Sequence, residues 1–235
     1  MWSYALLRLA FPVGLLLVQN AQSQNSSTYT NPYTSQPLTP VPSFTSPLPY
    51  TPTPAPGPGL SNGLALTPPM GFSTWNGFGP NINESLLRST IDTIASNGLK
   101  EAGFVFVNLD DGWQRYPGNR LDHPLEADPV KFPSGIKALA DYAHSKGLKL
   151  GIYSGPGQTT CAGYTGSQGH EVEDAKMFAD WGIDHLKYDS CCAYSNAPKE
   201  AVQQVVLTMS QALLASGRPI VYHACHCGWA VSLCS

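Results

Sequence analysis

The chain has 235 residues, of which 42% are hydrophobic and 12% charged, a composition that fits one or two globular domains. Its 13 basic and 16 acidic side chains give a formal net charge of −3. This balance argues against nucleic acid or an anionic membrane as a partner held by bulk electrostatics. No charged residue lies between Arg8 and Glu84, so the first third of the chain differs physically from the rest.

The N-terminus is typical of a secretory signal peptide. Residues 1–23 contain one basic residue, Arg8, then an apolar stretch at 9–18 and a small-residue site that ends at Ser23. The apolar stretch is too short to cross a bilayer, which needs about 20 residues. We therefore expect a secreted, extracellular chain without a membrane partner.

Residues 24–59 are rich in Pro, Ser and Thr and carry no charge. Such a segment buries too little apolar surface to offset the entropy of ordering its backbone, so it predicts a disordered linker. Asn25 and Asn83 each begin an N-glycosylation acceptor sequence, which is used only in a secreted chain. The six cysteines are consistent with an oxidising compartment.

Strand and helix patterns alternate through residues 60–235, the predicted folded domain. Strands are expected at 64–66, 104–109, 148–153, 183–188 and 219–222, and helices at 84–97, 134–146, 170–181 and 199–216. This order predicts an α/β fold with a parallel sheet. The length allows five strand–helix units at most, whereas a full eight-fold barrel needs about 250 residues. Both a small open sheet and an incomplete barrel fit.

Acidic side chains follow two of the predicted strands. Asp110 and Asp111 come after the second strand and Asp189 after the fourth, and parallel sheets bind ligands at this edge. Lys187 and Asp189, two residues apart on a strand, point to the same face, where a lysine keeps a carboxylate ionised by lowering its pKa. Two purely structural alternatives remain. An acidic residue at a strand end can cap the helix that follows, and Lys187 with Asp189 can be an ordinary buried ion pair.

The cysteines fall into two groups. Cys161 and Cys191 lie in the loops after the third and fourth strands, and a bridge between them would join these loops over the site. The His and Cys residues at 223–227 resemble metal ligands, but their spacing matches no tetrahedral scheme, so we expect no metal site.

Nine short motifs, in the family's order, resemble the α-galactosidase family, glycoside hydrolase family 27. They lie at residues 62–71, 107–113, 131–136, 147–153, 160–164, 169–170, 174–176, 181–182 and 186–189. The resemblance implies a (β/α)8 TIM-type barrel that hydrolyses terminal α-D-galactosyl residues of oligosaccharides or polysaccharides with retention, and that needs no cofactor.

By position, the resemblance implies that Asp189 is the catalytic nucleophile and that Cys161 and Cys191 form a disulfide. The substrate-binding residues that it implies are Asp110, Asp111, Lys187, Tyr153, Phe72 and Cys161.

The sequence departs from the family at three places. Phe72 stands where the family usually has Trp, and Pro80 and Gly112 stand where it often has a cysteine pair. From His226 onward the resemblance is lost, so we expect a barrel truncated after about five β/α units, without the acid/base aspartate and with impaired activity. Alternatives are an α-N-acetylgalactosaminidase or β-L-arabinopyranosidase of the same family, or a non-catalytic secreted carbohydrate-binding fragment.

Overall fold

The structure, a computed structural model, describes residues 62–191 and 198–225. The expected signal peptide at 1–23, the expected linker at 24–59, the acceptor Asn25 and residues 226–227 of the His/Cys group lie outside the described residues.

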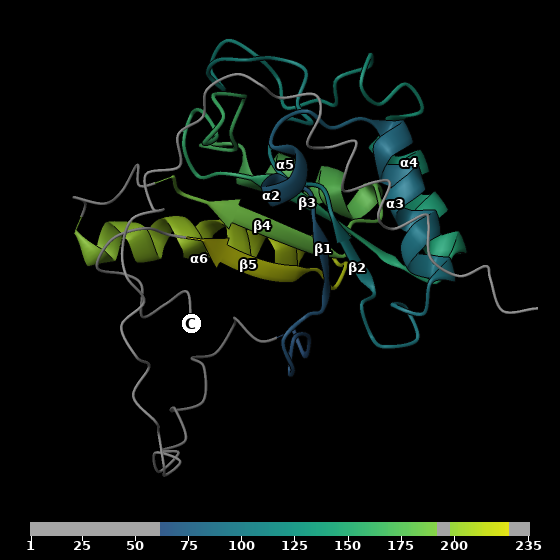
Figure 1. Ribbon diagram of the computed structural model, residues 1–235. Coiled ribbons are helices and arrows are strands. Elements are labelled where there is room, and N and C mark those ends of the chain that lie inside the picture. The colour runs from purple at the N-terminus through teal and green to yellow at the C-terminus, as the bar shows by residue number, and fades with distance from the viewer. Residues whose placement is uncertain (1–61, 192–197, 226–235) are drawn as a thin grey trace, which may run out of the picture. The chain divides into compact units, whose positions relative to one another are not determined.

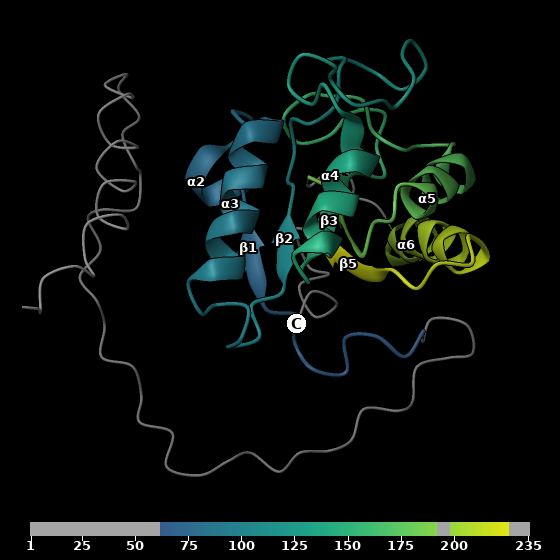
Figure 2. The same ribbon diagram turned by 90° about the vertical axis from the view of Figure 1, so that its right-hand side faces the viewer.

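Five parallel strands form one sheet, and their spatial order follows the chain. The strands are β1 (Gly71–Ser73), β2 (Phe106–Asn108), β3 (Lys149–Ser154), β4 (His185–Asp189) and β5 (Val221–Cys225). Helices α3 to α6 line one face of this sheet (Figures 1 and 2). The arrangement confirms the predicted (β/α) fold of TIM-barrel type, with four complete β/α units and a fifth strand in the described part of the chain.

Helices connect the strands as the periodicity predicts. They are α2 (Trp75–Phe78), α3 (Glu84–Ser96), α4 (Gly135–Ser145), α5 (Glu171–Asp180) and α6 (Lys199–Ala215). Only the four-residue α2 was not expected, because one turn is too short to show a helical repeat. A glycine follows each of the helices α3 to α6, at positions 98, 147, 182 and 217, and all four have positive φ values, which glycine adopts without a steric penalty.

The prediction of a first strand at 64–66 is wrong. Ala65 has a φ of 52°, outside the strand region, and the two prolines that follow at 68 and 69 lack the N–H that a strand donates. Strand β1 begins instead at Gly71, which pairs with Phe106. A Cβ atom at this position would overlap the Phe106 backbone, so glycine permits the close approach.

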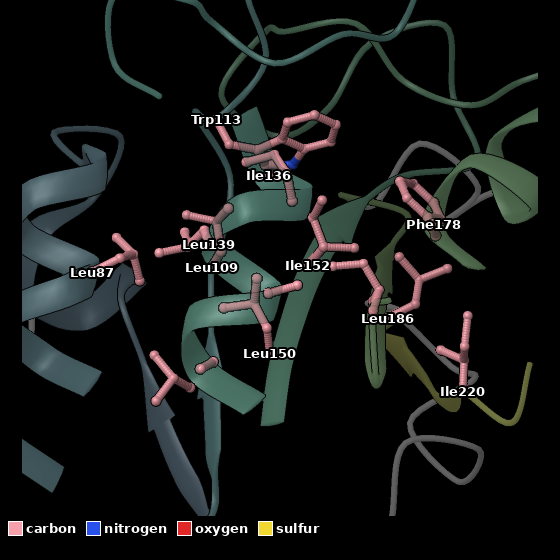
Figure 3. Packing of buried hydrophobic residues seen from close by; sticks show 14 of the residues in the cluster. Leu87, Leu109, Trp113, Ile136, Leu139, Leu150, Ile152, Phe178, Leu186 and Ile220 are labelled. Atoms are coloured by element: carbon pink, nitrogen blue, oxygen red, sulfur yellow. The ribbon is translucent and has the colours of Figure 1, made fainter. Parts of the chain in front are cut away.

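The hydrophobic core lies between the sheet and the helices. Figure 3 shows Leu150 and Ile152 of β3 and Leu186 of β4 directed toward this layer, and all three are buried. Because side chains alternate along a strand, Tyr153 and Lys187 point to the opposite face. The packing of the core thus determines which side chains face away from the helices. Among the described residues, no helix is both long and apolar enough to span a membrane.

Candidate active site

Two carboxylates from different strands meet at one lysine. Lys187, on β4, places its Nζ 3.0 Å from Asp110 Oδ2 and 3.8 Å from Asp189 Oδ2. Asp110 lies just beyond β2, and Asp189 is the last residue of β4. Their side chains are only 3% and 13% exposed. The carboxyl edge of the sheet therefore holds a compact, largely buried group with one positive and two negative charges.

Tyr153 of β3 lies between these groups. The Lys187 Nζ is 5.1 Å from the centroid of its ring, and the tyrosine hydroxyl donates to Cys161 Sγ at 2.8 Å. Burial, followed by the negative charges of Asp111 and Asp189, raises the pKa of Tyr153 far above its ordinary value. The side chain therefore stays neutral and keeps a hydroxyl proton to donate.

Asp111 has hydrogen-bond partners that differ from those of its neighbour Asp110. Its Oδ1 accepts from the Gly112 N–H and the Thr160 hydroxyl, both at 2.9 Å, and its Oδ2 accepts from the Ala162 N–H at 2.8 Å. Burial raises the pKa of Asp111, although these hydrogen bonds oppose the effect. The two adjacent carboxylates thus have different partners, and Asp111 fixes the loop that follows β3.

The end of β1 supports Asp110. The Ser73 hydroxyl donates to Asp110 Oδ2 at 3.3 Å, and the Thr74 hydroxyl oxygen accepts from the Asp110 N–H at 3.0 Å. Asp110 is therefore held through both its carboxylate and its backbone.

Two aromatic residues of this segment differ in their surroundings. Phe72 packs with the hydrophobic core, its ring edge-on to Phe78 with centroids 6.3 Å apart. Trp75, at the start of α2 and directly after Thr74, is 38% exposed. Sequence analysis did not select this tryptophan, although a large aromatic residue just after a strand is a signal that could have indicated it.

Cys161 and Cys191 form a disulfide, which confirms the pairing that the family resemblance implied. The bridge joins the loops after β3 and β4. The Cys191 N–H donates to Asp189 Oδ1 at 3.0 Å, and an oxygen of this carboxylate lies within 4.8 Å of both sulfur atoms. The disulfide is therefore part of the immediate surroundings of Asp189.

Pro80 and Gly112 are in contact, at the positions where the family often has a cysteine pair. A Cβ atom on Gly112 would lie 2.8 Å from the Cα of Pro80. The Lys131 ammonium donates to the carbonyls of both residues, at 3.3 and 2.8 Å. Backbone packing and one lysine thus join these two loops.

Within the two described ranges, the one cluster with metal-ligand spacing is Cys161, Asp189 and Cys191. Both sulfur atoms are already bonded to each other, so this cluster does not offer thiolate ligands. His223 and Cys225 of the His/Cys group lie on β5, where His223 is the ladder partner of Lys187.

A family model described as Alpha galactosidase A (Melibiase_2) matches residues 67–234. The chain belongs to this family. It is 50% identical over 170 residues to an α-galactosidase of Cyamopsis tetragonoloba, a match that covers 72% of this chain and 40% of that protein. The family membership that the nine motifs predicted is thereby confirmed, but the match runs past His226, where the resemblance was expected to end.

Solved structures of the α-galactosidase family superpose on the chain. The crystal structure of α-galactosidase I from Mortierella vinacea has a TM-score of 0.66 and 45% identity, and the match covers 70% of this chain and 42% of that one. An α-galactosidase from Saccharomyces cerevisiae with raffinose gives 0.65 and 42%, covering 70% and 36%. The chain thus spans about two fifths of the length of the relatives it matches.

Proposed function

We propose that this chain carries the galactose-binding and nucleophilic groups of a retaining α-galactosidase. The observation that carries the proposal is the meeting of Asp110 and Asp189 at the Lys187 ammonium, beside the ring of Tyr153. Ligands bind at this edge of a parallel barrel. The relatives named α-galactosidase, at 45–50% identity, support the same substrate class.

Asp189 is the proposed nucleophile. Its Oδ1 accepts the Cys191 N–H, and its Oδ2 faces the Lys187 ammonium at 3.8 Å. One carboxylate oxygen attacks the anomeric carbon, the bond to the leaving oxygen breaks, and a covalent glycosyl-enzyme forms. Water then displaces the carboxylate, so that two inversions give net retention.

The sugar is held by the groups around this carboxylate. Asp110 accepts hydrogen bonds from sugar hydroxyls and Lys187 donates to them, whereas Tyr153, whose one hydroxyl proton goes to Cys161 Sγ, lines the pocket with its ring. Asp111 and Cys161 complete the pocket from the loop side. Phe72 supports the pocket from the core, and the exposed ring of Trp75 supplies its apolar wall.

A retaining mechanism also needs a second carboxyl group about 5–5.5 Å from the nucleophile, to protonate the leaving oxygen. Asp110 and Asp111 already accept hydrogen bonds from protein donors. We therefore assign the proton-donor role to neither of them.

The proposal is tested with a ring-fluorinated α-galactosyl fluoride. Fluoride leaves with little need of a proton donor, and the ring fluorine slows hydrolysis of the glycosyl-enzyme, so the covalent adduct accumulates. We expect one galactosyl adduct per chain, located at Asp189 by mass spectrometry of its peptides, and none in Asp189→Asn. An adduct elsewhere, or galactose binding without any adduct, would overturn the nucleophile assignment and favour a carbohydrate-binding protein.

The same assay addresses the alternative substrates. Fluorides of α-N-acetylgalactosamine and β-L-arabinopyranose are compared with that of α-galactose at equal concentration. We expect the galactosyl compound to label fastest, and faster labelling by either rival would reassign the sugar.

We further propose that the chain is secreted. A disulfide such as Cys161–Cys191 persists in oxidising compartments, and the acceptor Asn83 is exposed. Expression in a secretory host, with N-terminal sequencing of the protein in the medium, should show cleavage close to residue 23. An uncleaved chain retained in the cells would contradict the proposal.

A further inference from the structure

Thr74 lies at the point where strand β1 ends and helix α2 begins. The parallel ladder between β1 and β2 continues up to this residue. The Phe106 N–H donates to the Met70 carbonyl, and the Thr74 N–H donates to the Asn108 carbonyl, both at 3.1 Å. In this register, the next bond of the ladder would run from the Asp110 N–H to the carbonyl oxygen of Thr74.

The start of α2 uses that carbonyl for another bond. Thr74 has helical backbone angles, a φ of −73° and a ψ of −23°, and its carbonyl accepts the Phe78 N–H at 2.9 Å. The Asp110 N–H donates instead to the hydroxyl oxygen of Thr74, at 3.0 Å. The side chain of Thr74 thus replaces its own backbone carbonyl as the acceptor in the ladder.

The hydroxyl of Thr74 is free for this bond because it does not cap the helix. A threonine before a helix usually accepts an N–H of the first turn with its side chain. Thr74 accepts none of the N–H groups of α2 in this way, and the structure describes every residue of that helix. The hydroxyl therefore supports the end of β2 rather than the start of α2.

Burial makes the bond important for Asp110. Thr74 is fully buried and Asp110 is only 3% exposed. A buried N–H without an acceptor is unfavourable, so loss of the hydroxyl forces the Asp110 backbone to shift toward another partner. The Asp110 carboxylate, which contacts Lys187 and the Ser73 hydroxyl through Oδ2, would move with the backbone.

We propose that Thr74 is a positioning residue for Asp110: its hydroxyl replaces the ladder carbonyl that α2 uses, and so fixes the point of β2 from which Asp110 faces the sugar. The proposal rests on Asp110 as a sugar-binding residue of the proposed function. The next residue, Trp75, supplies the apolar wall of the same pocket. The exchange of acceptors thus lets the chain enter α2 at this point without losing the support of Asp110.

Three variants separate this role from general packing. Thr74→Val removes the acceptor and keeps the shape of the side chain, whereas Thr74→Ser keeps the hydroxyl and removes a methyl group. Thr165→Val is the matched control, because Thr165 is also fully buried and its hydroxyl donates to the Tyr116 carbonyl at 3.2 Å. Thermal unfolding of the full-length variants measures the structural cost of each change.

The first measurement is the affinity for galactose, by titration calorimetry. We expect Thr74→Val to raise the Kd about tenfold, an effect of the size expected when a buried donor loses its acceptor. Thr74→Ser and Thr165→Val should bind as the wild type does. Wild-type affinity in Thr74→Val, an equal loss in Thr74→Ser, or an equal loss in Thr165→Val would overturn the proposal.

The second measurement does not depend on the sugar. Hydrogen exchange of the Asp110 amide, followed by NMR, should be slow in the wild type and in Thr74→Ser and fast in Thr74→Val. If the wild type does not bind galactose, the proposed function fails, whereas the exchange data still decide the role of Thr74. If Thr74→Val does not fold, the wild type alone provides the test. Its Asp110 amide should be as protected as that of Leu109, which donates to the Gly151 carbonyl at 3.0 Å, and faster exchange would overturn the proposal.

Discussion

Lys187 and Asp110 form a 3.0 Å ion pair although they are 77 residues apart and although β4, which carries Lys187, is not a neighbour of β2, which ends just before Asp110. The lysine reaches across Tyr153, on the intervening strand β3, to make it. The sequence predicts Asp189 as the partner of Lys187, because the two share a strand face. In the structure Lys187 contacts both Asp110 and Asp189, and Asp110 is the closer of the two.

Loss of this lysine should be costly. In Lys187→Met, Asp110 stays buried without its cation, and breaking a buried pair in this way costs about 3 kcal/mol. Lys176→Met is the control, since the Lys176–Asp180 pair on α5 is exposed and contributes less than about 0.5 kcal/mol. Urea unfolding of both variants measures the difference. Equal losses would show that the buried pair adds nothing.

His185 should make the protein sensitive to acid. Burial, followed by the charges of His223 and Lys187, lowers the pKa of His185 to about 4. Because the unfolded chain binds the proton more tightly, stability is complete above about pH 6.5 and is lost as the pH falls through 4, by about 3 kcal/mol.

The comparison with His185→Phe isolates this effect. The variant keeps an aromatic ring against Phe106 but has no proton to gain. Asp174, whose pKa burial raises to about 6, titrates in both proteins and cancels in the difference. We expect the unfolding free energies of the wild type and the variant to converge toward pH 8. Toward pH 4 the variant should be the more stable of the two. A difference that does not change with pH would refute the assignment.

Gly112 should tolerate no side chain. Gly112→Ala combines a φ of 99° with a contact of 2.8 Å to Pro80, and we expect a loss of about 3 kcal/mol. Gly163→Ala is the matched control, because Gly163 also has a positive φ but has open space around its Cβ position. It should lose only about 1 kcal/mol. Chemical denaturation distinguishes the two, and equal losses would mean that the contact with Pro80 is unimportant.

Asn83 caps a helix and is also the proposed glycan acceptor. Its Oδ1 accepts the Leu86 N–H and caps α3, while its Nδ2 is the atom to which the proposed glycan would attach. Asn83→Asp should keep the cap and the stability, whereas Asn83→Ala should lose about 1 kcal/mol. Both should lose the glycan mass in a chain secreted from eukaryotic cells. A wild type without a glycan at this position would contradict the acceptor assignment.

Local patterns determine most of the fold. The apolar stretches at 104–109 and 148–153 predict β2 and β3, and glycines end the helices where the sequence places them. These features depend on residues close in the sequence, through backbone sterics and side-chain periodicity. The first strand is the exception, because its position depends on the close approach of Gly71 to Phe106, which is not a local property.

The sequence by itself determined that acidic residues follow the second and fourth strands and that the chain resembles the α-galactosidase family. Only the tertiary structure decided which groups meet there: Lys187 with Asp110, Asp111 with the loop at 160–162, and the Cys191 N–H with Asp189. The physical reason is that strand register and loop packing bring distant residues within hydrogen-bonding distance, and spacing along the chain does not specify either of them.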